Sequence, residues 1–147
     1  MPLSRLLALA LAFFALTAHA DVVDIDNAQL AKLVASGVPV VDIRTVPEWK
    51  ETGVVAGSRL LTFFDEKGQY NAAAWLEKLK ATTKPDQPVI LICRSGNRTQ
   101  KVSQFLAQQA GYKTVYNVRD GIRGWSKEGR PLTPAPSDIA CAPPRNC

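Results

Sequence analysis

A short apolar segment that runs directly into a cysteine constrains this chain more than any other feature. Residues 89–92 read Val-Ile-Leu-Ile, and Cys93 follows them without a break. After a loop of polar and small residues, apolar side chains recur from Thr99 onward with the spacing of one helix face (Val102, Phe105, Leu106 and Ala110). A strand, a tight loop and a helix in this order predict that Cys93 lies at the carboxyl end of a sheet strand, where open α/β sheets bind ligands.

The loop after Cys93 has the composition of an anion-binding site. Arg94 and Arg98 supply positive charge, Ser95 supplies a hydroxyl group, and Gly96 permits backbone angles that side chains forbid. Backbone N–H groups and the positive end of the next helix face the same small volume. Such surroundings favour the thiolate form of a cysteine. We therefore predict that Cys93 is a nucleophile, and its charged neighbours argue against the alternative of a cysteine buried in the core.

The first 20 residues have the pattern of an export signal. Arg5 precedes an apolar run over residues 6–16, and Ala18-His19-Ala20 matches a small-x-small cleavage site. The run is too short to span a membrane, which takes about 20 residues. We expect cleavage before Asp21 and export to the periplasm, with secretion as the alternative, and no stable membrane association afterwards.

Cleavage of this signal would remove His19, the only histidine. The remaining chain would lack the base of a cysteine–histidine hydrolase and the ligands of a histidine-based zinc site. The formal net charge of the whole chain is +5, but no run of like charges concentrates it. We therefore expect no nucleic-acid partner, and the positive excess suits anionic small substrates instead. We also expect no metal and no cofactor.

Strand-like and helix-like segments alternate along residues 22–128, which predicts an α/β fold with a parallel sheet and helices on both faces. The expected strands are 22–25, 38–43, 59–63, 89–92 and 113–118. The expected helices are 27–36, 47–51, 71–83, 99–110 and 121–128. The three tryptophans are expected in the core, and Phe63 and Phe64 either line the mouth of a pocket or belong to the core.

The composition changes near residue 131. Half of the ten prolines lie in residues 131–147, so we expect residues 132–147 to form a tail outside the core. With Cys93, the tail cysteines Cys141 and Cys147 make an odd number of thiols in an oxidising compartment. A Cys141–Cys147 disulfide that leaves Cys93 free is the simplest pairing. In the alternative, one tail thiol reaches Cys93.

Three blocks of the sequence together resemble the rhodanese (sulfurtransferase) family. They are Val40 to Arg44 with Glu48-Trp49, the loop from Cys93 to Arg98, and Gly111 to Pro131 with its Val115-Tyr116-Asn117-Val118 strand, Gly121, Trp125 and Gly129-Arg130-Pro131. The resemblance implies one rhodanese domain over residues 21–131, a three-layer fold with a central, mainly parallel five-stranded sheet flanked by helices. It also implies that Cys93 is the nucleophile, that Asp42 and Arg44 brace neighbouring loops, and that five loop residues bind the substrate: Arg94, Ser95, Gly96, Asn97 and Arg98.

The resemblance further implies transfer of a sulfane sulfur through a Cys93 persulfide to a thiol, cyanide or protein acceptor. The loop arginines favour an anionic donor such as thiosulfate or polysulfide. One alternative is an exported module that senses sulfur compounds, thiols or redox state without turnover. Another is a phosphatase or arsenate reductase, whose signature has five residues between cysteine and arginine where this chain has four. Ser58 and Asp120 depart from the family pattern and leave loop packing and donor preference open.

Overall fold

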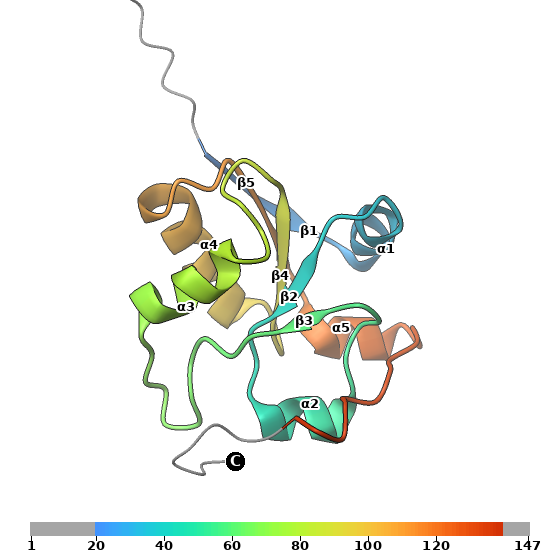
Figure 1. Cartoon of the computed structure of the whole chain (residues 1–147). Helices are drawn as coiled ribbons and strands as arrows, with labels where there is room; N and C mark the ends of the chain where they lie inside the picture. Colours follow the sequence, from blue (N-terminus) through green and yellow to red (C-terminus); the bar gives the residue numbers. More distant parts are fainter. Residues whose placement is uncertain (1–19, 140–147) are drawn as a thin grey trace, which may run out of the picture.

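Five parallel strands form the central sheet of the computed structural model, which describes residues 20–139 (Figure 1). The strands are β1 (Asp21–Ile25), β2 (Val40–Asp42), β3 (Arg59–Leu60), β4 (Val89–Ile92) and β5 (Thr114–Val118), in the spatial order β1-β5-β4-β2-β3. The helices are α1 (Asn27–Ala35), α2 (Val46–Thr52), α3 (Ala72–Lys80), α4 (Asn97–Gln109) and α5 (Gly121–Lys127). The expected α/β class and parallel sheet are confirmed.

The element bounds differ from the sequence prediction by up to three residues, and two of the differences lie beside the sites described below. Helix α4 begins at Asn97 instead of Thr99, because Gly96 takes the N-cap position with φ 87° and the helix starts directly after it. Apolar periodicity cannot reveal this start, because the first turn carries polar side chains. The expected strand 59–63 has regular pairing only over β3, yet the N–H groups of Leu61 and Phe63 still donate to carbonyls of residues 42 and 43, at 3.0 and 3.1 Å.

Side-chain caps fix the starts of α1 and α3. Asp26 accepts a hydrogen bond from the Gln29 N–H at 2.8 Å, and the Gln29 side chain accepts one from the Asp26 N–H at 2.9 Å. The Asn71 side chain accepts a hydrogen bond from the Ala74 N–H at 3.0 Å. These caps satisfy N–H groups that the first turn of a helix cannot pair internally.

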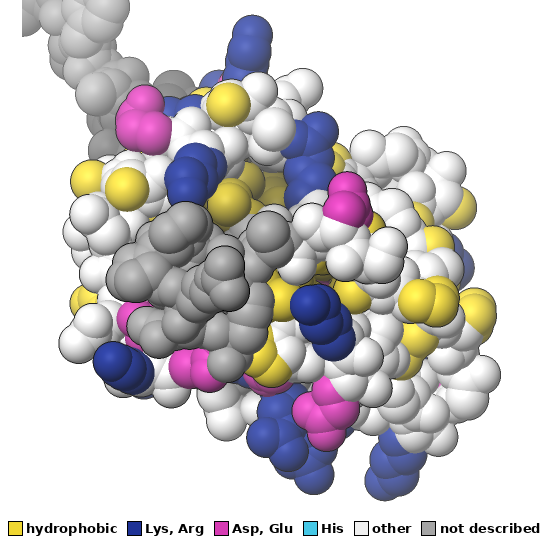
Figure 2. Space-filling view, turned by 60° about the horizontal axis from the view of Figure 1, so that its bottom comes forward, with side chains coloured by type: hydrophobic (Ala, Val, Ile, Leu, Met, Phe, Trp, Pro, Cys, Tyr) yellow, Lys and Arg dark blue, Asp and Glu magenta, His cyan; other side chains and the backbone are white. Residues whose placement is uncertain are grey.

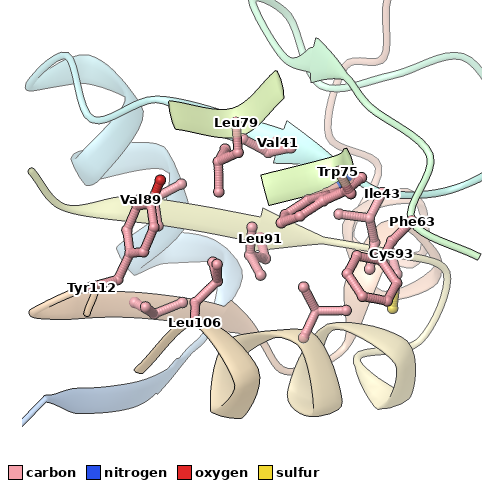
Figure 3. Packing of buried hydrophobic residues seen from close by; sticks show 12 residues of the cluster. Val41, Ile43, Phe63, Trp75, Leu79, Val89, Leu91, Cys93, Leu106 and Tyr112 are labelled. Atoms are coloured by element: carbon pink, nitrogen blue, oxygen red, sulfur yellow. The ribbon is translucent and has the colours of Figure 1, made fainter. Parts of the chain in front are cut away.

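Two hydrophobic clusters lie on opposite faces of the sheet, and β4 contributes to both because side chains alternate along a strand. Val89, Leu91 and Cys93 belong to the cluster beneath α3 and α4 (Figure 3). Ile90 and Ile92 belong to the cluster beneath α1 and α5, while α2 lies at the carboxyl ends of the strands (Figure 1). The buried residues include Phe63 and, as expected, all three tryptophans: Trp49, Trp75 and Trp125.

A buried ion pair joins the end of β2 to α2. The Arg44 guanidinium lies 2.7 Å from the Asp42 carboxylate, and both side chains are at most 1% exposed. Arg44 also donates to the Thr52 hydroxyl at 2.8 Å and to the Gly53 carbonyl at 2.9 Å. These contacts hold the last turn of α2 against the sheet, which is the geometry of a brace.

The chain remains bound to the domain beyond residue 131. Thr133 and Val54 exchange two backbone hydrogen bonds of 2.8 Å each, and Leu132 packs against the second cluster. The expected tail therefore starts with two residues that belong to the packed structure. Residues 1–19 of the expected signal (residues 1–20) and both tail cysteines lie outside the described residues. Between residues 20 and 139, no helix has the length and apolar character needed to cross a membrane.

We predict that Arg44→Leu lowers the free energy of unfolding by about 3–5 kcal/mol, because it leaves the Asp42 carboxylate buried without its cation. Urea denaturation at pH 7 measures the loss. Lys80→Leu is the control: its pair with Glu77 is exposed and 3.6 Å long, so the expected effect is below about 1 kcal/mol. Equal losses in the two variants would contradict the bracing role.

Candidate active site

Cys93 follows β4 and lies just beneath the surface at the carboxyl end of the sheet. Its side chain points to the same face as Leu91 and belongs to the cluster that also contains Phe63 (Figure 3). The residue is only 1% exposed, so the expectation that neighbouring arginines keep the thiol out of the core is wrong. The arginines do not prevent burial because their side chains point elsewhere. Within residues 20–139, Cys93 is a free thiol.

Two groups of the loop and α4 contact the sulfur. The Gly96 N–H donates to Cys93 Sγ at 3.2 Å. Thr99 Oγ1 lies 3.4 Å from Sγ and also donates to the Gly96 carbonyl at 3.0 Å. A protonated thiol can donate to this hydroxyl, and a thiolate can accept from it. Thr99 is fully buried and was not among the expected site residues; its place in the first helical turn after an anion-binding loop was the available signal.

Helix α5 fixes the orientation of the loop backbone. The N–H groups of Ile122 and Arg123 donate to the carbonyls of Cys93 and Arg94 at 2.9 and 3.1 Å. A Cβ on Gly121 would lie 2.5 Å from the Cys93 carbonyl oxygen, so only glycine allows this approach. Because the N–H of a trans peptide unit points opposite to its carbonyl, these two bonds direct the N–H groups of Arg94 and Ser95 away from α5.

At Gly96 the Cys93 loop also lies very close to the segment between β5 and α5. Its φ of 87° is in the left-handed region, and a Cβ at this position would overlap the Arg119 carbonyl oxygen. Any other residue would therefore suffer both backbone strain and a backbone clash. The expectation that Gly96 supplies unusual backbone angles is confirmed.

Arg98 forms a two-armed ion pair with Glu48 of α2. Its Nη2 and Nη1 atoms donate to the two carboxylate oxygens at 2.6 and 2.9 Å, and Glu48 also accepts from the Thr45 N–H and hydroxyl at 3.1 Å. Burial raises the pKa of Glu48, but the hydrogen bonds from Arg98 and Thr45 and the Arg98 charge outweigh it and bring the pKa down to about 2. The hydrogen bond to Glu48 is in turn the main cause that raises the pKa of Arg98.

The five expected binding residues therefore occupy different surroundings. Gly96 contacts the sulfur, and the Arg98 guanidinium is bound to Glu48 instead of pointing into the loop. Asn97 is exposed at the start of α4. Arg94 and Ser95 line a depression of about 1260 Å³ between the loop, α2 and α5. Basic and acidic side chains are both present on this face, with apolar areas between them (Figure 2).

The site has the parts needed for nucleophilic chemistry at sulfur. It combines a thiol, a backbone N–H aimed at that thiol, and a hydroxyl within hydrogen-bonding distance of it. In the part of the chain from residue 20 to residue 139, no three His, Cys, Asp or Glu side chains are grouped so that they could hold a metal ion.

Comparison with known proteins agrees with this geometry. The model of the rhodanese-like domain family matches residues 26–128. Rhodanese-like domain-containing protein 17 of Arabidopsis thaliana is 30% identical over 76% of this chain and 72% of its own length. Thiosulfate sulfurtransferase 18 of the same plant is 28% identical over 76% of this chain and 84% of its own length.

A shorter match and a solved structure complete the comparison. Thiosulfate sulfurtransferase GlpE of Actinobacillus pleuropneumoniae is 40% identical over 50 residues, which are 34% of this chain and 45% of that protein. The crystal structure of Rv0390 from M. tuberculosis superimposes with a TM-score of 0.65 and 25% identity, over 79% of this chain and 99% of that one.

We predict that Gly96→Ala lowers the free energy of unfolding by about 2–4 kcal/mol, because it adds left-handed strain and a backbone clash. Gly37→Ala is the matched control, since Gly37 has a similar φ of 88° and open space around its Cβ position; its expected cost is about 1 kcal/mol. Urea denaturation compares the two variants. Equal costs would show that contact with Arg119 does not matter.

We predict that Glu48→Gln loses about 2 kcal/mol of stability at pH 7, because ionised Glu48 holds Arg98; the figure is discounted for the partial exposure of the pair. The folded pKa of about 2 lies below the ordinary value of 4.5. This stabilisation is therefore complete above pH 4.5 and is lost as the pH falls towards 2. Urea denaturation of both proteins should show a difference that shrinks over this range. A difference independent of pH would contradict the assignment.

Proposed function

The chain belongs to the rhodanese-like domain family, and we propose that it is a sulfurtransferase that carries a sulfane sulfur from an anionic donor to a thiol or cyanide as a Cys93 persulfide. The observation that carries this proposal is the Gly96 N–H, which points at Sγ from 3.2 Å. A hydrogen-bond donor in that position stabilises negative charge on the thiolate and, after a sulfur atom has been added, on the persulfide. The relatives named as thiosulfate sulfurtransferases support the same activity.

The loading step needs no reagent other than the donor. The Cys93 thiolate attacks the outer sulfur of thiosulfate, and a new bond forms between Sγ and that sulfur. The bond between the two thiosulfate sulfurs breaks, and its electron pair leaves with sulfite. Attack by a thiolate needs no general base, which is consistent with a site in which a backbone amide and a hydroxyl contact Sγ.

The burial of Cys93 supports sulfur as the cargo. The residue is 1% exposed, so a bulky electrophile would not reach Sγ without movement of the loop. A single added sulfur atom lies about 2 Å beyond Sγ and is among the smallest groups that a covered thiol can accept.

The Arg98–Glu48 pair argues against the phosphatase and arsenate reductase alternatives. Glu48 binds one N–H of each terminal nitrogen of the guanidinium, which leaves three of its five N–H donors. The Glu48 carboxylate also balances the charge of Arg98, which an arginine that clamps a tetrahedral oxyanion offers to its substrate. Arg98 is therefore less suited to bind an oxyanion than an unpaired arginine would be.

We also propose that the protein is exported after cleavage before Asp21. Asp21 is the first residue of β1, and its N–H donates to the Lys113 carbonyl at 3.0 Å. A cut before Asp21 therefore leaves the whole of β1 in the sheet, and the new amino group can still donate to the same carbonyl. This compatibility supports the assignment of residues 1–20 as a signal.

We predict that thiosulfate adds one sulfur atom, about 32 Da, to the mature protein, and that cyanide or a thiol removes it. Intact-mass spectrometry measures the gain. Cys93→Ala should show no gain, because the acceptor of the sulfur is missing. Cys141→Ala and Cys147→Ala serve as matched controls and should gain the sulfur as the wild type does.

Two outcomes would contradict the proposal. If neither thiosulfate nor polysulfide loads the wild type, the non-turnover sensing module becomes the better reading of the site. If the sulfur is found on a tail cysteine and Cys93→Ala is loaded normally, Cys93 is not the carrier.

A further inference from the structure

The depression beside the Cys93 loop is larger than a small inorganic donor requires. Its volume is about 1260 Å³, and it is bounded by α2, by Arg94 and Ser95, and by α5 with its two flanking ends. Pockets for organic ligands typically have volumes of about 300–1,000 Å³. Thiosulfate has only a few atoms, so the depression has room for an organic molecule next to Arg94 and Ser95 of the Cys93 loop.

Positive charges dominate the unpaired groups of this depression. Its lining includes three exposed cations that have no ion pair among residues 20–139: Arg94, Arg123 and Lys127. Three of its four carboxylates already have partners, in the pairs Glu48–Arg98 at 2.6 Å, Asp120–Arg119 at 3.6 Å and Glu128–Arg130 at 2.6 Å. Glu51 is the fourth. A ligand therefore meets three available cations and one available carboxylate.

The three cations are placed along one path that starts at the sulfur loop. Arg94 is the residue directly after Cys93, and its carbonyl accepts a hydrogen bond from the Arg123 N–H at 3.1 Å. Lys127 follows Arg123 by one helical turn of α5, so the two side chains lie on the same side of the helix. A ligand with separated carboxylates can thus contact successive cations while one end stays near Cys93.

We propose that this depression binds the sulfur acceptor, and that the acceptor is a low-molecular-weight thiol with two or more carboxylates. Arg123 and Lys127 are its specificity-determining residues. The inference rests on the proposed sulfurtransferase function and adds the chemical class of the acceptor. Arginine and lysine recognise carboxylates by charge-assisted hydrogen bonds, and a tripeptide-sized acidic thiol fits the volume.

The transfer step balances without any further reagent. The acceptor thiol loses its proton to water and attacks the outer sulfur of the Cys93 persulfide. A bond forms between the acceptor sulfur and the outer sulfur of the persulfide, and the bond from Cys93 Sγ to that outer sulfur breaks. Cys93 leaves as a thiolate, and the product is the persulfide of the acceptor.

The test compares two acceptors with thiosulfate as the donor. Mercaptosuccinate carries two carboxylates, and 2-mercaptoethanol carries none. For the double variant Arg123→Gln/Lys127→Gln, we expect the ratio of kcat/KM for mercaptosuccinate to kcat/KM for 2-mercaptoethanol to fall about tenfold, through KM for the dicarboxylate. Added salt should reduce the wild-type preference, because it screens exposed charges.

Matched variants distinguish binding of the acceptor in the depression from an effect of the protein's net charge. Lys78→Gln/Lys101→Gln removes two exposed cations outside the depression and should leave the ratio within twofold of the wild type. Glu51→Gln removes the unpaired carboxylate and should raise the ratio.

Each remaining outcome has one meaning. A wild type without preference for mercaptosuccinate, or a double variant that keeps the preference, overturns the acceptor site and leaves the sulfurtransferase function in place. A wild type that transfers sulfur to cyanide and to neither thiol also overturns the acceptor site. A wild type that transfers sulfur to no acceptor, cyanide included, overturns the proposed function itself.

Discussion

The binding of two loop carbonyls by α5 is the interaction on which the site depends. The carbonyl and the N–H of a trans peptide unit point in opposite directions. The amides of Ile122 and Arg123 hold the carbonyls of Cys93 and Arg94, which directs the N–H groups of Arg94 and Ser95 away from α5. The next amide along the loop, the Gly96 N–H, donates to Sγ. The orientation exists before any sulfur or donor is bound, so loading requires little reorganisation. The absence of a Cβ at Gly96 and Gly121 lets these backbones meet.

Helix α2 connects Arg44, which follows β2, with Arg98 of α4. Each of them is bound by a carboxylate, Arg44 by Asp42 and Arg98 by Glu48. Glu48 lies in α2, and Arg44 also contacts the last turn of that helix. A seven-residue helix that has little stability of its own is thereby tied to β2 at one point and to α4 at another. The charge near the sulfur is fixed by these pairs, which leaves the exposed arginines and lysine for solutes.

The fold and the position of Cys93 at the end of β4 followed from the sequence because each had a local signal. The apolar run before Cys93 and the capping residues of α1 and α3 depend on a few neighbouring positions. The environment of the arginines had no such signal: Arg98 meets Glu48 across a long sequence separation, and nothing in the loop shows that its guanidinium is already bound. Thr99 was missed for a related reason, since only its rotation towards Sγ distinguishes it from any residue of a first helical turn. The burial of Cys93 likewise depends on distant packing.

The strand order implies that β1 can pair only late in folding. β1 pairs only with β5, the last strand, with Asp21 opposite Thr114. The first strand to leave a ribosome or a translocation channel must therefore wait for the last before it has a partner, and such distant pairings form slowly. β1 is suited to this delay, because Ile25 is its single buried residue and Asp21 and Asp24 carry charge. An unpaired edge strand with charged side chains and a single buried residue is a poor template for association with other chains.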